Sequence, residues 1–206
     1  GRGKLKLDTN LADGGYARAV YLNAREGSFP SLQEVLLSVG GRLNVPPSAS
    51  AARETDQFVR QFPRIERLAL LGCDAWSEGM DGLPWGGLTA LQVMPQVFPH
   101  ALPLGMRDMI HLKTFHVDGA TDLASLPEWI GELNQLTSLQ ISGSCIVSLP
   151  QSVTNLQHLR SLDISYSPLS RLPVDIGRMT ALEVLDLDGC RDLTTPLPPS
   201  TAELAN

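Results

Sequence analysis

A repeat of 23 to 24 residues runs through the second half of this 206-residue chain and constrains its fold more than any other feature. Seven apolar or proline positions recur in register 23 residues later: Leu136, Leu139, Ile141, Leu149, Pro150, Val153 and Leu156 return as Leu159, Leu162, Ile164, Leu172, Pro173, Ile176 and Met179. A further copy begins at Leu182, and two earlier copies begin at Leu88 and Leu112. A chain with this period is expected to stack one supersecondary unit per repeat and to bury a continuous core between neighbours.

A strand phrase of the form Leu-x-Leu can be followed through eight copies. The same apolar position of each copy falls at residues 5, 35, 68, 91, 115, 139, 162 and 185. The first two intervals are 30 and 33 residues long, and the others are 23 or 24, so the first two contain insertions. One insertion, residues 51–62, places Phe58 and Phe62 four residues apart among charged residues and predicts a short amphipathic helix.

Two apolar periods alternate within each repeat. Successive side chains of a strand point to opposite faces, so the leucines of Leu-x-Leu face the core and the residues between them face outward. The return segment Leu149-Pro150-x-x-Val153-x-x-Leu156 changes to a three-residue spacing, which is typical of an inward-facing helical stripe. We therefore expect an α/β fold: a right-handed solenoid with a concave parallel sheet of about eight short strands and helical or irregular return segments.

A column of mostly small, polar or thiol residues follows the strands, three positions after the last apolar residue of each. Its members are Asn10, Gly40, Cys73, Gln96, Ala120, Ser144, Ser167 and Cys190. Backbone N–H and C=O groups leave the sheet at such a turn and need partners, which Asn, Ser or Cys side chains provide. We accordingly expect Cys73 and Cys190 to be buried turn thiols.

These residues resemble the leucine-rich-repeat family, strongly over residues 88–197 and weakly before residue 64. The phrase Leu126-Pro127-x-x-Ile130-Gly131-x-Leu133 is similar to the intracellular LPxxI class, whereas the extracellular receptor class would carry Gly-x-Ile-Pro at residues 147–150 and 170–173. Residues 167–173 (Ser-Pro-Leu-Ser-Arg-Leu-Pro) and 185–193 (Leu-Asp-Leu-Asp-Gly-Cys-Arg-Asp-Leu) are similar to type III secreted effectors of plant-pathogenic bacteria and to plant intracellular immune receptors. Both groups use the repeats to recognise proteins, and the irregular first half favours the effector.

The repeat register predicts a single domain over residues 1–206. Within it we expect irregular repeats with insertions at 1–64, regular repeats of 23 to 24 residues at 65–197, and a carboxy-terminal tail at 198–206. The chain begins at Gly1 rather than at Met, which indicates a piece of a longer protein.

Charge and composition argue against several partners. The 16 Lys and Arg against 22 Asp and Glu give a net charge of −6, and no basic tract is long enough to neutralise a row of phosphates, so we expect no nucleic-acid partner. No apolar run reaches the roughly 18 residues of a membrane helix, and no signal-peptide pattern is present, so we expect no membrane association. Three dispersed cysteines and the lack of an Asn-x-Ser/Thr sequon favour an intracellular location, the host cytoplasm in the case of an effector.

Signatures of catalysis are absent from the sequence, which has no Gly-x-x-x-x-Gly-Lys-Ser/Thr, Gly-x-Gly-x-x-Gly, Gly-x-Ser-x-Gly or His-Glu-x-x-His motif. The four histidines do not stand at metal-ligand spacing with a cysteine, so we expect no metal and no cofactor. Cys190-Arg191-Asp192 has the Cys-x-Asp form of one bacterial ubiquitin-ligase family that also carries leucine-rich repeats. The adjacent carboxylate disfavours a reactive thiolate and Cys190 falls in the turn column, so we expect no catalytic activity in this chain.

The outward residues of the strands predict a binding surface that is apolar in its amino-terminal half and acidic in its carboxy-terminal half. The candidate partner-binding residues are Leu36, Leu71, Met94, His116, Asp118, Gln140, Asp163, Tyr166, Asp186 and Asp188. Tyr166 is the single large residue in a column that also contains Gly119, Gly143 and Gly189, and an isolated aromatic of this kind is typical of a binding hot spot. The alternative is that Tyr166 only covers a neighbouring strand and that the aspartates are solvated charges.

The sequence thus predicts a monomeric protein-recognition module whose protein partner carries a basic patch beside an apolar anchor. Two other functions stay open. The chain could serve as the substrate receptor of a ubiquitin ligase whose catalytic domain lies outside it, or as a structural spacer or dimerisation unit.

Overall fold

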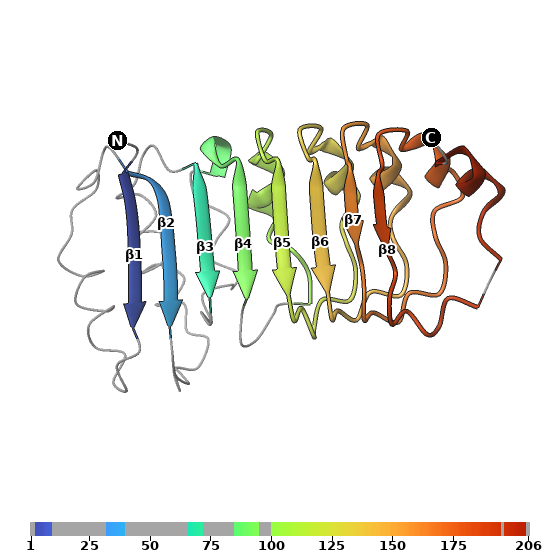
Figure 1. Ribbon diagram of the computed structural model, residues 1–206, viewed down its shortest axis with the longest axis horizontal. Helices are drawn as coiled ribbons and strands as arrows, with labels where there is room; N and C mark the ends of the chain where they lie inside the picture. Colours follow the sequence, from blue (N-terminus) through green and yellow to red (C-terminus); the bar gives the residue numbers. More distant parts are fainter. Residues whose placement is uncertain are drawn as a thin grey trace.

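A parallel sheet of eight strands, in the order of the chain, extends from β1 to β8 of the computed structural model, and the chain continues beyond β8 (Figure 1). The structure describes residues 3–9, 32–39, 66–71, 85–94, 100–194 and 196–204. The strands are β1 (Gly3–Thr9), β2 (Leu32–Val39), β3 (Arg67–Leu71), β4 (Ala90–Met94), β5 (Thr114–Asp118), β6 (Ser138–Ser142), β7 (Ser161–Asp163) and β8 (Val184–Asp186). The amphipathic helix expected at 51–62 lies outside the described residues.

The strand register matches the sequence period at every step. The apolar positions 5, 35, 68, 91, 115, 139, 162 and 185 pair with one another in succession across the sheet, from Leu5 opposite Val35 to Leu162 opposite Leu185. Every pairing is parallel, including the two that span the long intervals. The insertions of the first half therefore enlarge the connections without displacing the strands.

The return segments carry short 3-10 helices, which explains their three-residue spacing. These helices are η2 (Trp85–Gly87), η3 (Leu104–Asp108), η4 (Glu128–Glu132), η5 (Gln151–Asn155), η6 (Ile176–Arg178) and η7 (Pro199–Leu204). In four repeats the carbonyl of Pro103, Pro127, Pro150 or Pro173 accepts a hydrogen bond from the N–H three residues later, at 3.0 to 3.2 Å. Proline suits this position because its fixed φ is already helical in range and its missing N–H is not needed there.

The same three-residue step continues until the chain re-enters the sheet. In the return segment that follows Pro150, the N–H of Leu156 donates to the carbonyl of Val153, and the N–H of Leu159 donates to that of Leu156. All three apolar residues are fully buried. The helical stripe expected from the sequence is therefore present, with three residues per turn rather than the 3.6 of an α-helix.

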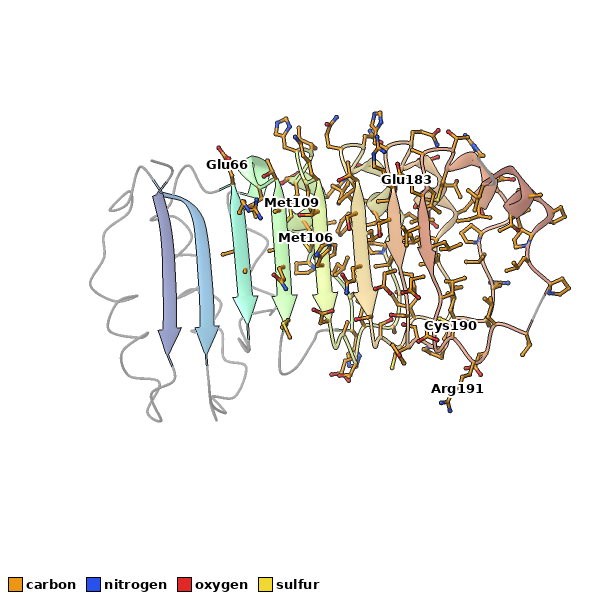
Figure 2. The ribbon with its side chains drawn as sticks, viewed as in Figure 1. Glu66, Met106, Met109, Glu183, Cys190 and Arg191 are labelled. Carbon is orange, nitrogen blue, oxygen red and sulfur yellow. The ribbon has the colours of Figure 1, made fainter. Side chains whose placement is uncertain are left out.

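Among the described residues the core is a continuous stack of mostly aliphatic side chains behind the sheet, with Phe115 fully buried in it and Trp129 packed against it. Phe115, Leu139 and Leu162 occupy the same position in successive strands and are fully buried. Met106 and Met109, from the η3 repeat, are also fully buried and lie at the level of β4 and β5 (Figure 2). Leu185 is only half-buried, because β8 is the last strand of the sheet and packs on one side alone.

The serines of the turn column supply hydrogen bonds between repeats, as expected. Ser144 and Ser167 are buried, and their hydroxyl oxygens lie 2.8 Å apart in a bond that links two repeats. The Ser167 hydroxyl also accepts a bond from the backbone N–H of Ser144 at 3.3 Å. The Cys190 thiol donates to the carbonyl of Ile164 at 3.2 Å, as expected of a turn thiol, but it is only partly buried rather than buried because it follows β8, the last strand of the sheet. Cys73 lies outside the described residues.

Gly131 occupies a position where two repeats approach each other too closely for a side chain. A Cβ at this residue would lie 2.2 Å from the backbone carbonyl oxygen of Ser152. The Gly131→Ala substitution should therefore force η4 and η5 apart and reduce the free energy of unfolding by about 1–3 kcal/mol. Urea denaturation measures this loss, and Gly86→Ala is the matched control because its Cβ would meet its nearest neighbour at 3.7 Å. Equal losses in the two variants would contradict the packing of η4 against η5.

Candidate protein-binding face

The outward residues of the strands form rows that run across the sheet. The central row, in register from β3 to β8, contains Ala69, Gln92, His116, Gln140, Asp163 and Asp186. Along β4 to β7 these residues are exposed or half-buried while the residues between them are buried, and in β8 Asp186 is exposed beside the half-buried Leu185. The structure thus brings His116, Gln140, Asp163 and Asp186 together on one face, as the alternation in the sequence predicts.

The amino-terminal part of this face is described only in part. Met94 is 41% exposed and lies opposite Leu71 in the sheet. Leu36 and Leu71 are in strands β2 and β3, but their side chains lie outside the described part of the chain. The exposed thioether of Met94 is a flexible apolar contact of the kind found on adaptable binding surfaces.

The centre of the face is ordered by hydrogen bonds between strands. Nε2 of His116 and Oγ of Ser138 lie 2.9 Å apart. One carboxylate oxygen of Asp118 accepts bonds from the side chains of Gln140 and Ser142, both at 3.1 Å. These polar groups are therefore held in fixed positions before any partner arrives, which lowers the entropy cost of binding to them.

Two aspartates at the acidic end of the face, Asp163 and Asp186, also stabilise backbone turns. One carboxylate oxygen of Asp163 accepts a bond from the N–H of Ser165 at 2.8 Å. Asp186 makes the equivalent bond to the N–H of Asp188 at 2.9 Å. Aspartate commonly closes a turn by bonding to the N–H two residues later. Asp186 and Asp188 nevertheless remain exposed.

Tyr166 stands in a backbone conformation that its neighbours in the column occupy with glycine. Its φ is 54°, and the φ values of Gly119, Gly143 and Gly189 are 72°, 62° and 69°. A non-glycine residue in this left-handed region costs on the order of 1–3 kcal/mol. Tyr166 is the one non-glycine residue with positive φ in the described chain. The glycines at the same position of other repeats predict this left-handed backbone from the sequence, because glycine is the usual residue where φ is positive.

The ring of Tyr166 is fixed by contacts with the next repeat. Its hydroxyl donates to Oδ2 of Asp188 at 2.8 Å, and its N–H donates to the carbonyl oxygen of the same residue at 2.7 Å. The ring lies against Gly189, where an added Cβ would come within 2.7 Å of Cδ1 of the ring. The hydrogen bond to Asp188, followed by the negative charge of that carboxylate, raises the pKa of Tyr166 above its ordinary value. Tyr166 therefore packs against the next repeat at Gly189, yet it remains 66% exposed to solvent.

The described residues show no arrangement for metal chemistry. No group of three or more His, Cys, Asp or Glu in this part of the chain could hold a metal ion. Both cysteines that the structure describes are free thiols bonded to backbone carbonyls, Cys145 to Thr121 at 2.9 Å and Cys190 to Ile164. None of the helices in the described ranges is long and apolar enough to cross a membrane.

Comparison with known families agrees with the geometry. A family model described as a leucine-rich repeat region matches residues 104–206, which is half of the chain. The chain belongs to the leucine-rich-repeat family, and its fold is an α/β leucine-rich-repeat solenoid. A search of curated proteins found no match.

Several solved structures resemble this solenoid. The Arabidopsis receptor kinase HAESA, in complex with a peptide hormone and a co-receptor, is 25% identical, with a TM-score of 0.55 over 69% of this chain and 25% of HAESA. An internalin of Listeria monocytogenes is 14% identical, with a TM-score of 0.53 over 87% of this chain and 54% of the internalin. The leucine-rich-repeat domain of the type III effector XopL is 26% identical, with a TM-score of 0.45 over 72% of this chain and 68% of that domain. The chain thus spans about a quarter of the length of HAESA.

Proposed function

We propose that this chain is a protein-recognition module that binds its partner on the outward face of strands β4 to β8. The observation that carries the proposal is the combination of exposed Met94 and Asp186 on strands β4 and β8 with exposed Tyr166 and Asp188 in the turns that follow β7 and β8. Large side chains that water surrounds on a rigid surface are typical of the anchors of protein interfaces. The HAESA complex with its peptide hormone supports the proposal, because a related solenoid there binds a polypeptide.

The partner is expected to carry a basic patch. The ion pairs that the structure describes are Arg107 with Glu132 and Arg160 with Glu183, so the aspartates of the face take part in neither of them. Asp118, Asp163, Asp186 and Asp188 belong to three of the four repeats that contain β5 to β8, and their negative potential adds up over the face. Positive side chains of a partner opposite these aspartates would be attracted by this negative potential and would orient the partner on the face.

Salt should slow the association of the partner. Oppositely charged surfaces attract each other over roughly 10 Å at 0.1 M salt and over about 3 Å at 1 M, so steering weakens as salt is added. We expect the association rate constant for a partner captured by pull-down to fall about tenfold or more between low salt and 0.5 M salt. Surface plasmon resonance at several salt concentrations measures it. A rate constant that does not change with salt would contradict an acidic binding face.

We also propose that the chain belongs to the intracellular LPxxI class and acts as the target-binding repeat domain of a bacterial type III effector in the host cytoplasm. The prolines that open the 3-10 helices are those of the LPxxI phrases, which supports the class. Residues 167–173 and 185–193 resemble both type III effectors and plant intracellular immune receptors, and the irregular first half of the sequence favours the effector. The repeat domain of a plant intracellular immune receptor is the alternative on the same residues.

A ubiquitin ligase that uses this chain as its substrate receptor is the remaining alternative. It places the catalytic domain outside the chain, which itself has no catalytic activity in this proposal. A ligase assay on a longer parent protein, with residues 1–206 present or deleted, separates the alternatives. Loss of substrate ubiquitination on deletion favours the receptor role, and ubiquitin transfer by the chain alone would contradict the proposal of a pure binding module.

The proposed module is a monomer that folds as a single domain over residues 1–206. A monomer leaves its sheet face open to a different protein, whereas a dimerisation unit would cover part of its surface with a second copy. Light scattering on the isolated chain gives its mass in solution. A mass of 22.3 kDa supports the monomer, and twice that mass favours the structural alternative.

A further inference from the structure

Tyr166 is held in place by Asp188, although most of its side chain is exposed to solvent. Two hydrogen bonds, from the hydroxyl and from the backbone N–H of Tyr166, join it to the side chain and the backbone of Asp188. The ring lies against Gly189, which has no side chain to push it away. The aromatic ring is therefore held in one orientation while most of its surface remains in water.

Two carboxylates act on Tyr166: that of Asp188 accepts a hydrogen bond from its hydroxyl, and that of Asp186 is near enough to raise its pKa as well. Asp186 and Asp188 are both exposed and lie in the same repeat, directly after Leu185 and Leu187. Neither is in an ion pair of the described residues, which join Arg107 to Glu132 and Arg160 to Glu183. Arg191, the cation nearest to them in sequence, lies beyond the lower end of β8, the end at which Asp186 stands, and it takes part in neither of these ion pairs (Figure 2).

We propose that Tyr166, Asp186 and Asp188 form a binding site for an arginine side chain of the partner. The guanidinium group would stack on the exposed ring surface of Tyr166, and its N–H groups would donate to the carboxylates of Asp186 and Asp188. This inference rests on the proposed function and specifies the chemistry of its partner at one place on the face.

Arginine fits this site better than other side chains for physical reasons. An apolar side chain on Tyr166 would remove water from two carboxylates without giving them a partner, which is unfavourable. Lysine would supply the charge, but its compact ammonium group does not stack on a ring and cannot donate in a planar fork. Arginine provides a flat cation for the ring face and several N–H donors for the carboxylates at once.

The decisive variant is Tyr166→Gly, because it removes the ring without harming the fold. Glycine adopts a φ near 54° without strain, and Gly119, Gly143 and Gly189 occupy the same position in three other repeats. We expect urea denaturation to show this variant to be as stable as the parent or more so. Tyr166→Phe is the second variant, since it keeps the ring and loses the hydroxyl that binds Asp188.

The probe is a displayed library of random 12-residue peptides, selected on the 206-residue chain. We expect the enriched peptides to share an arginine, to bind Tyr166→Gly about tenfold or more weakly, and to bind Tyr166→Phe with a smaller loss. Replacement of that arginine by lysine should weaken binding to the parent chain and should matter little for Tyr166→Gly, because the ring that discriminates the two cations is gone.

Three results would overturn the arginine site. They are a library that yields no peptide with Tyr166-dependent binding, enriched peptides without a basic residue, and equal affinity for the parent and for Tyr166→Gly. Peptides whose binding is lost on His116→Ala or Gln140→Ala but kept on Tyr166→Gly would disprove the arginine site while leaving the binding face in place. Binding that no substitution on the sheet face affects would count against both.

Discussion

Phe115→Ala is expected to reduce the free energy of unfolding by about 3–5 kcal/mol, the largest loss of any single substitution considered for this chain. Phe115 is the largest of the fully buried side chains that the structure describes, and it stands between Leu91 and Leu139 in the stacked core. Removal of its ring leaves a cavity between repeats that the rigid backbone of the sheet cannot close. Urea denaturation followed by circular dichroism measures the loss.

Phe115→Leu is the control for this prediction. Leucine is the residue found at the same position in β4, β6 and β7, so it suits the packing and should cost less than about 1.5 kcal/mol. A loss below about 1 kcal/mol for Phe115→Ala would mean that the position is not part of a close-packed core.

Leu162→Ala should reduce the free energy of unfolding by about 2–5 kcal/mol, because Leu162 is fully buried between Leu139 and Leu185. In a solenoid each repeat contacts only its neighbours, so the loss should appear first in the repeats next to the substitution. Hydrogen exchange should show faster exchange in residues 138–186 than in β4 and β5.

Leu185→Ala is the matched control for Leu162→Ala. Leu185 has the same place in the repeat but is only half-buried, so its removal should cost less. Equal losses for the two variants, or a loss below about 0.5 kcal/mol for Leu162→Ala, would contradict the core position of Leu162.

The sheet could be predicted from the sequence because its register depends on a single repeated position. Leu5, Val35 and Leu68 keep that position in spite of the insertions between them, since a slip of one residue would turn the inward leucines of a strand to the solvent. The type of helix in the return segments is harder to predict from the sequence. Three-residue spacing fits both an α-helix and a 3-10 helix over a short segment, and the bonds from residues such as Val153 to Pro150 decide between them.

The candidate face could be predicted in outline, but its internal contacts could not. Alternation in the strands places His116, Gln140 and Asp163 on one surface. The bond from Gln140 to Asp118 depends on side-chain conformations that residue spacing does not specify. Likewise, the sequence marks Tyr166 as an exception in a row of glycines, while its left-handed backbone and its bond to Asp188 emerge only from the structure.

Binding of the partner by the sheet face is tested most directly by a charge reversal on that face. The measurement is the affinity of a captured partner for a chain that carries Asp163→Lys and Asp186→Lys together, which are neighbours in the central row. The matched control reverses the exposed Asp175, which lies on the return segment before η6. With both variants folded by circular dichroism, the account predicts at least a hundredfold weaker binding for the face variant, about 2.7 kcal/mol, and little change for the control. Equal affinity of the parent, the face variant and the control would contradict the account and place recognition on another surface.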